Sequence, residues 1–176
     1  MNNAISILLD EHSLLLKAIK TAEKIQKIED NKFYLEVMQG VISCFKTFSE
    51  IYHYPKEEKI LYPLLVKRSH YMSVEFIHEI CDHHEDFKSL MKEIEVAHNT
   101  SDLRTLRKVT DEYLTLLEEH IRKENSIILS VAGVLLTEEE AEFILEEFNA
   151  LDKQHGEKEK LLNMIWKINL QFEEPT

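Results

Sequence analysis

The chain has 176 residues, with 33 acidic and 21 basic side chains, three glycines, three prolines and two cysteines. A formal net charge of −12 argues against binding to nucleic acid or to anionic membranes, because both need a basic face. The length indicates one domain over residues 1–176, and the scarcity of glycine and proline favours helices.

No segment of the sequence resembles a membrane span or a targeting signal. No apolar run approaches the roughly 20 residues that cross a bilayer. The N-terminal segment MNNAISILLDEH lacks the basic and apolar regions of a signal peptide. Cys44 and Cys81 are too few for a disulfide framework or a thiolate metal site. We therefore expect a cytoplasmic protein.

Apolar residues at three- and four-residue steps predict five helices. The first covers about residues 4–28 and carries His12 inside its apolar stripe. The second covers about 33–67, after a polar link in which Asn31 is the candidate N-cap. Pro55 should bend or break this helix, because proline lacks an N–H and clashes with the preceding turn.

The last three helices follow from the same periodicity. They are predicted at about 72–97, 102–131 and 138–170. Thr137 and Glu140 have the spacing of a capping box, which marks the start of the fifth helix.

Together the helices predict an all-α fold, an antiparallel up-down four-helix bundle over about residues 4–131 with an additional C-terminal helix. Such bundles bury the apolar stripes of neighbouring helices against one another. In the fourth and fifth helices, the residues expected in these stripes include Leu117, Ile127, Val131, Phe143, Ile144, Phe148 and Trp166.

Two segments place a histidine and a glutamate four residues apart, on one face of a helix. IYHYPKEEKILYPL contains His53 and Glu57, and EEHIRKEN contains His120 and Glu124. Chance alone gives about 1.3 such pairs in a chain of this composition, so the spacing by itself is weak evidence.

Context separates these two pairs from a third one. His155 and Glu159 lie in the charged run KQHGEKEK, which predicts an exposed pair. The other pairs lie in apolar registers, as do His12 and the histidines of the third helix. Burial of such groups without a partner is costly. Four helices that each bury one at mid-length indicate a shared partner, which a pair of metal ions would supply.

The mixture of imidazole and carboxylate indicates which metals fit. It suits iron, manganese or zinc better than calcium or magnesium, which prefer oxygen ligands alone. Carboxylates can also bridge two ions and offset their charge. Spacing and ligand type do not separate iron from manganese.

The order of these residues resembles the hemerythrin-like, or HHE cation-binding, domain family over about residues 5–148. The segment HYPKEEKILYP is similar to that family's H-x-P-K-E-E/D-x-x-L-F-P. The resemblance implies a non-haem centre of two iron ions, bridged by the two glutamates, with histidines as terminal ligands. It implies that the metal ligands are His12, His53, Glu57, His84, His120 and Glu124.

The ligand on the third helix needs a choice between neighbours. His83 and His84 flank the centre of the apolar face equally, and the resemblance favours His84 because Phe87 and Leu90 follow it at the family's spacing. Oxygen-carrying members have a second histidine four residues earlier, where this chain has Ile80. More open coordination then favours peroxide, NO or redox chemistry over simple reversible O₂ carriage.

Outer hydrogen-bond partners usually orient the imidazoles of a metal site. Asp82 and Glu119 are the candidates in this sequence, with a solvent-exposed position as the alternative.

We therefore expect a di-iron protein that binds O₂, peroxide or NO and exchanges electrons with an unidentified redox partner. The alternatives are an enzyme that turns over peroxide or NO, an iron-binding or sensing protein, and an acidic interaction module without metal. A ferritin-like oxidase needs Glu-x-x-His on two helices. Glu50 and His53 supply it once, but Leu117 stands three residues before His120. The sequence does not indicate an oligomeric state.

Overall fold

The computed structural model describes residues 3–68, 74–155 and 163, and this part of the chain is helical with no strand. The predicted continuation of the fifth helix to residue 170, with Trp166 and Glu159, lies outside the described residues. None of the described helices is long and apolar enough to cross a membrane.

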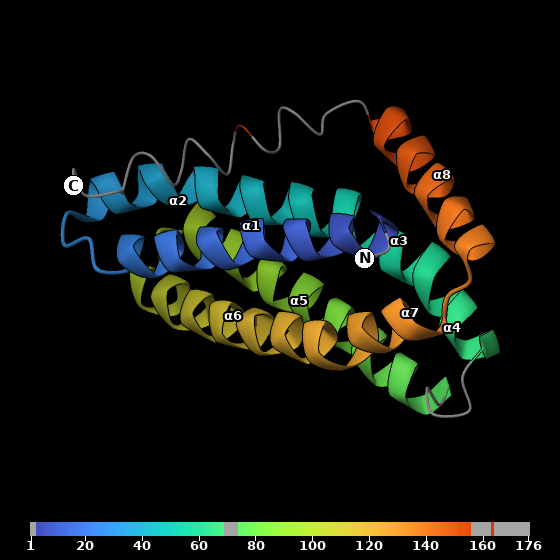
Figure 1. The fold of residues 1–176 in the computed structure, drawn as a ribbon. Helices are drawn as coiled ribbons and strands as arrows, with labels where there is room; N and C mark the ends of the chain where they lie inside the picture. Colours follow the sequence, from blue (N-terminus) through green and yellow to red (C-terminus); the bar gives the residue numbers. More distant parts are fainter. Residues whose placement is uncertain (1–2, 69–73, 156–162, 164–176) are drawn as a thin grey trace.

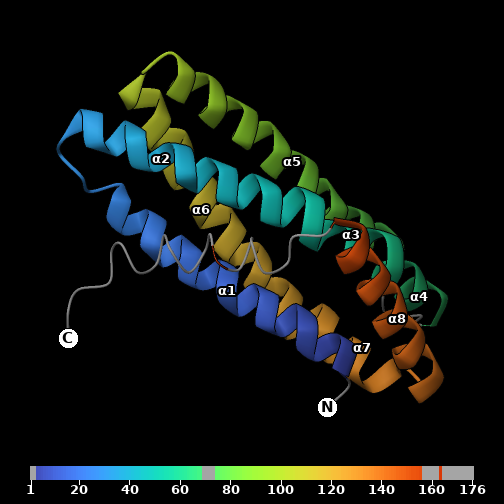
Figure 2. The ribbon, with the colours of Figure 1, turned by 90° about the horizontal axis from the view of Figure 1, so that it is seen from above.

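Four helical rods form a bundle, and a further helix crosses one of its ends (Figures 1 and 2). The first and third rods are α1 (Asn3–Ile25) and α5 (Val74–Asn99). The second consists of α2 (Asn31–Phe45), the π-helical η1 (Lys46–His53), α3 (Tyr54–Lys56), the π-helical η2 (Glu57–Leu61) and α4 (Tyr62–Arg68). The fourth consists of α6 (Leu103–Lys123), the π-helical η3 (Glu124–Ile128) and α7 (Leu129–Leu135).

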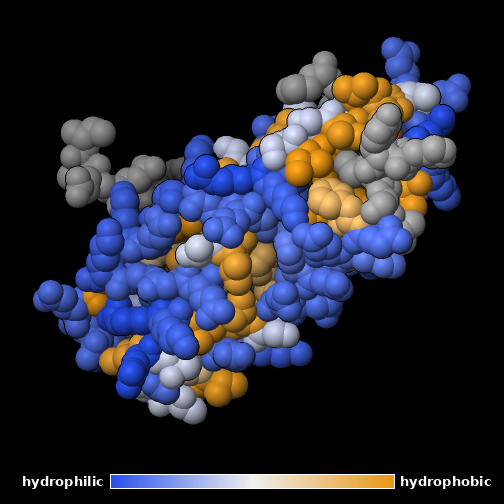
Figure 3. Space-filling view, turned by 90° about the horizontal axis from the view of Figure 1, so that it is seen from below, coloured by the Kyte–Doolittle hydropathy of each residue, from blue (hydrophilic) through white to orange (hydrophobic). Residues whose placement is uncertain are grey.

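The crossing helix is α8 (Glu138–His155), which packs against α1, η1 and η2. The predicted bundle with an additional C-terminal helix is confirmed. Seen from below, the surface is mainly hydrophilic, with apolar side chains showing between the charged ones (Figure 3).

The second rod buries side chains at a four-residue step instead of the 3.6-residue step of an α-helix. Four residues of α-helix turn about 40° beyond a full circle, so a continuous α-helix would carry this stripe away from the core. The wider turns of η1 and η2 offset that drift. The buried residues at this step are Val41, Phe45, Ser49, His53, Glu57, Leu61 and Leu65.

Pro55 lies in the first turn of α3, directly after η1. A break does not occur there, because the rod stays helical from Asn31 to Arg68 with a change of helix type. The rod changes direction between α2 and α4, next to α3 (Figure 1). The π-helical segments end at His53 and begin again at Glu57, so both side chains keep one inward direction.

The fourth rod shows the same step, which corrects one prediction. His120, Glu124 and Ile128 are buried in succession, whereas Ile127 is 41% exposed. The π-helical turn of η3 shifts the inward register by one residue, so the prediction that Ile127 faces the core is wrong. In α8, Phe143 was also expected to be buried but is 50% exposed.

Helix ends are fixed by short polar contacts. The Asp30 side chain accepts hydrogen bonds from the backbone N–H groups of Lys32 (2.9 Å) and Phe33 (3.0 Å), so Asp30, and not the predicted Asn31, is the N-cap of α2. The predicted capping box of α8 is confirmed. The backbone N–H of Glu140 donates to the Thr137 hydroxyl (3.2 Å), and the N–H of Thr137 donates to the Glu140 carboxylate (3.0 Å).

The apolar core is divided into two clusters along the bundle. One contains Leu15 of α1, Phe87 of α5 and Leu117 of α6. The other contains Leu8 of α1 and Ile80 of α5, about two turns away. The side chains between them, in every rod, are polar and buried, so the fold encloses a polar layer at mid-length.

Candidate metal centre

The polar layer includes the six side chains predicted to bind metal. They come from all four rods, and none is more than 3% exposed. The structure brings together His12 from α1, His53 and Glu57 from the second rod, His84 from α5, and His120 and Glu124 from the fourth rod.

The histidines form two pairs. The Nε2 atoms of His12 and His53 lie 2.9 Å apart, and those of His84 and His120 lie 3.0 Å apart. Two nitrogens that bind one ion at about 2.1 Å and at a right angle would lie about 3.0 Å apart. Each pair therefore has the spacing of two ligands on a single ion.

Glu57 lies between the two pairs. Its Oε1 is 3.4 Å from Nε2 of His12 and 3.4 Å from Nε2 of His53, while its Oε2 is 3.7 Å from Nε2 of His84. One carboxylate oxygen thus faces each histidine pair.

Glu124 reaches both pairs with a single oxygen. Its Oε2 is 3.3 Å from Nε2 of His12 and 3.3 Å from Nε2 of His120. Its other oxygen, Oε1, accepts a hydrogen bond from the Tyr62 hydroxyl. The two glutamates therefore serve the centre differently.

The carboxylates show that a cation fits between them. Both oxygens of Glu57 and Oε2 of Glu124 are buried, and among the described residues none has a hydrogen-bond donor. A buried carboxylate oxygen without a donor carries a large desolvation cost. A pair of divalent ions bound by imidazole and carboxylate would remove that cost, and this donor set suits iron or manganese.

Outer hydrogen bonds fix the direction of three imidazoles. His12 Nδ1 contacts Oδ1 of Asn125 (2.6 Å), His53 Nδ1 contacts Oε2 of Glu11 (2.8 Å), and His84 Nδ1 contacts Oε1 of Glu58 (2.6 Å). Each Nδ1–H donates outward, so each Nε2 presents its lone pair to the centre.

For this role the sequence indicated Asp82 and Glu119 as candidates, with a solvent-exposed position as the alternative. Both residues are exposed, as that alternative has it, and the actual outer partners were missed. A signal did exist, because each partner adjoins a ligand in sequence. Glu11 precedes His12, Glu58 follows Glu57, and Asn125 follows Glu124. Each of them supports a histidine on a different rod.

The structure also separates the two neighbouring histidines of α5. His84 is fully buried within the centre, whereas His83 lies beside it with its Nδ1 3.4 Å from Nδ1 of His120. His83, Asp86, Phe87 and Lys123 help to line a pocket of about 300 Å³ that reaches His120. This pocket is a route from the surface that ends at a predicted ligand.

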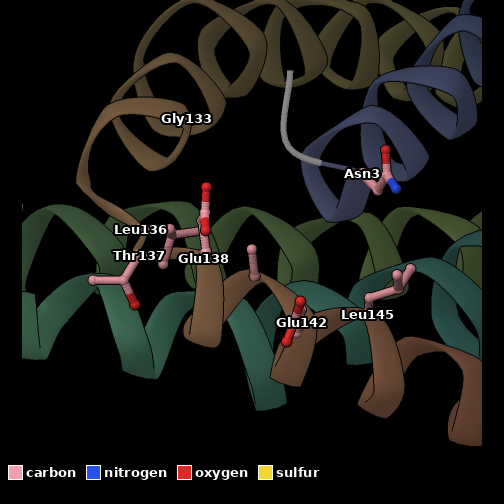
Figure 4. Close-up of a pocket in the computed structure, with 8 residues that line it drawn as sticks. Asn3, Gly133, Leu136, Thr137, Glu138, Glu142 and Leu145 are labelled. Atoms are coloured by element: carbon pink, nitrogen blue, oxygen red, sulfur yellow. The ribbon is translucent and has the colours of Figure 1, made fainter.

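A larger pocket of about 410 Å³ is separate from the centre. It lies between Asn3 of α1, Gly133 of α7 and the start of α8 (Figure 4). Glu138 and Glu142 line it, and no histidine does. It carries none of the predicted ligands.

Charge in the metal-free centre is shared among the imidazoles and carboxylates. Burial opposes protonation of His12, but Glu124 and Glu57 raise its pKa to about 10. Burial acts likewise on His53, and Glu57 and Glu11 raise its pKa to about 9. Since their Nε2 atoms are 2.9 Å apart, there is room for one N–H between them. At neutral pH this pair holds a proton in the place where one metal ion would lie.

The other histidine pair differs. Burial lowers the pKa of His120 to about 4, in spite of the opposing charge of Glu124. Burial also disfavours charge on Glu57, but His53 and His12 hold the pKa of that carboxyl well below its usual range. The centre therefore keeps anionic carboxylates beside an uncharged His120, which is the state in which both can bind a metal.

Replacement of Tyr62 by phenylalanine should destabilise the metal-free protein. The change leaves Oε1 of Glu124 buried without a donor, which costs about 1–3 kcal/mol in the free energy of unfolding. Unfolding of the metal-free protein by denaturant, after a chelator has removed any metal, measures the loss of stability. The matched control is Tyr34→Phe, because Tyr34 donates to Oε1 of Gln26, and this half-buried residue can accept a hydrogen bond from water instead. Equal losses in both variants would contradict this role for Tyr62.

Comparison with known proteins agrees with this geometry. A sequence model of the hemerythrin HHE cation binding domain matches residues 3–132, which include all six clustered side chains. No curated protein and no solved structure matches the chain. The matched region covers most of the chain, and the chain belongs to the hemerythrin HHE cation-binding domain family.

Proposed function

We propose that this protein is a non-haem di-iron protein that binds O₂ or a related small ligand, peroxide or NO. The observation that carries the proposal is Glu57, which presents one oxygen to each of two histidine pairs. In this proposal His12 and His53 hold one ion, and His84 and His120 hold the other. Glu57 and Glu124 are shared by both ions.

The chemistry that two bound iron ions would supply is electron transfer to a small ligand at an open coordination position. The number of protein ligands supports open positions. Four imidazoles and two carboxylates are too few to complete two six-coordinate shells. Oxygen-carrying hemerythrins have a further histidine four residues before the ligand that His84 resembles. This chain has Ile80 there, and Ile80 is fully buried.

The protein's own residues would hold the imidazoles and exclude water. The Tyr54 ring stacks on His84, with 3.9 Å between ring centres, and Phe87 lies edge-on to His120 at 5.1 Å. The two apolar clusters close the polar layer on both sides. The pocket beside His83 gives a small ligand access to the edge of the centre at His120.

Peroxide turnover at the same site is a second candidate, and a specific observation favours it. His83, Asp86, Glu119 and Lys123 place groups that can exchange protons in the pocket that ends at His120. A carrier has no need of proton-exchanging groups. Disproportionation, in which one peroxide is oxidised to O₂ and a second is reduced to two waters, moves two protons from the first to the second. The ferritin-like alternative is weaker, because Glu50 is half-buried and belongs to neither metal cluster.

Iron loading tests the proposed function. After anaerobic loading and removal of loose metal, we expect about two iron ions per chain, and about one or fewer in His120→Ala, which removes a ligand. Elemental analysis measures the ratio. The control His78→Ala removes an exposed histidine of α5, the helix that carries His84, and should bind as much iron as the unaltered chain. Less than one ion in the unaltered chain would refute the proposal.

Peroxide assays separate the two candidates. If the iron-loaded protein turns over peroxide, the rate should fall at least tenfold in His83→Phe, which removes a proton-exchanging group but none of the six ligands. Consumption of peroxide at 240 nm can be followed directly. If the unaltered chain and His83→Phe both consume peroxide only as fast as free iron does, the enzyme proposal is refuted. The proposal that the protein binds a small ligand would still stand.

The metal-free protein should lose stability when the pH rises from 7 to 10. The pKa of His12 is raised to about 10 and that of His53 to about 9, whereas a histidine of the unfolded chain has a pKa of 6.5. The stability that these shifts contribute is therefore fully present below pH 6.5. It is lost as the pH rises through the folded pKa values and the shared proton dissociates. Metal-bound imidazoles carry no such proton, so the loaded protein should lack this loss.

Thermal melting at several pH values, with and without metal, measures the effect. His12→Gln removes one of the two imidazoles and should flatten the pH dependence of the metal-free protein. A metal-free protein that melts at the same temperature at pH 7 and pH 10 would show that no proton is held there.

A further inference from the structure

We infer that α8, which lies outside the family-matched region, is part of the support of the metal centre. In this inference Asp152 of α8 positions the imidazole of His53 through Lys56 and Glu11. It rests on the proposed function, since positioning matters only if His53 binds a metal ion. Within the described residues, no such chain of contacts joins α8 to the other cluster, around His84 and His120.

A continuous chain of charged contacts joins α8 to the centre. Oδ1 of Asp152 is 2.9 Å from Nζ of Lys56, and Nζ of Lys56 is 2.5 Å from Oε1 of Glu11. The other oxygen of Glu11, Oε2, accepts the Nδ1–H of His53 at 2.8 Å. Glu11 therefore divides its two oxygens between the lysine and the candidate ligand.

The buried ammonium group of Lys56 requires these charged contacts. Its side chain is fully buried, and a buried ammonium group is tolerated only with close counter-charges. Its Nζ also lies 3.6 Å from the centre of the Tyr52 ring. One of its two carboxylate partners, Glu11, lies on α1, and the other, Asp152, lies on α8.

Loss of the Asp152 charge would be transmitted inward. Lys56 would then depend on Glu11 for its counter-charge and draw that carboxylate away from His53. The His53 ring would lose its fixed direction, and its Nε2 would no longer point steadily at the ion shared with His12. The coupling is reciprocal, so metal bound by His53 should also stabilise the docked position of α8.

A second ion pair of α8 provides a matched control. Nε of Arg68, on α4, is 2.7 Å from Oε1 of Glu140, and the arginine side chain is 49% exposed. This pair also joins α8 to the second rod, but it has no contact with the centre. Asp152→Asn and Glu140→Gln remove the same charge from the same helix, one within the network and one outside it.

The test is titration of the full-length, chelator-stripped protein with cobalt(II), followed by the visible absorption of the bound ion. We expect two equivalents in the unaltered chain. In Asp152→Asn one equivalent should bind about 10- to 100-fold more weakly with an altered spectrum, while the other is unchanged. Glu140→Gln should match the unaltered chain, and Asp152→Glu should recover most of the affinity.

The outcomes separate the two proposals. Two equivalents with unaltered affinity and spectrum in Asp152→Asn would overturn the inference and leave the proposed function standing. No uptake by the unaltered chain would overturn both. If Asp152→Asn does not fold, hydrogen exchange of the unaltered chain tests the reciprocal effect. Bound cobalt should slow the exchange of the α8 amides, and α8 exchange rates that cobalt does not change would equally overturn the inference.

Discussion

The structure depends on one arrangement, the placement of the Glu57 carboxylate between two pairs of imidazoles in a layer that excludes water. Two oxygens without hydrogen-bond donors, buried at the middle of a bundle, are unfavourable unless positive charge lies beside them. In the metal-free protein a proton held by His12 and His53 partly supplies that charge. A pair of metal ions would supply it fully. The apolar clusters on either side make the layer dry and so strengthen every charge interaction within it.

The helices are adapted to this layer. Burial at four-residue steps is incompatible with a long α-helix, and both rods that carry a His-x-x-x-Glu pair contain π-helical turns next to that pair. Such turns are common at functional sites, where they direct a side chain at the expense of regular hydrogen bonding. The outer contacts then join the rods to one another. Glu11, Glu58 and Asn125 each adjoin one ligand and hold the imidazole of another, so the direction of three of the four rings depends on a neighbouring rod.

Sequence reasoning found the bundle and the clustered side chains because those signals are local. Helical periodicity, the Thr137–Glu140 capping box and a histidine with a glutamate one turn later can all be read along one segment. It placed Ile127 in the core because it assumed an α-helical step, and the π-helical turn that buries Ile128 instead leaves no mark in periodicity alone. The outer partners were missed for a related reason. The partner of His53 lies on α1 and that of Lys56 lies on α8, and no spacing within one helix reveals a contact between two.

The most direct test of the central claim is anomalous diffraction at the iron absorption edge from crystals of the iron-loaded protein. The account predicts two peaks, one beside the Nε2 atoms of His12 and His53 and one beside those of His84 and His120, with Glu57 between them. A single peak, or peaks remote from this layer, would contradict a shared dinuclear centre.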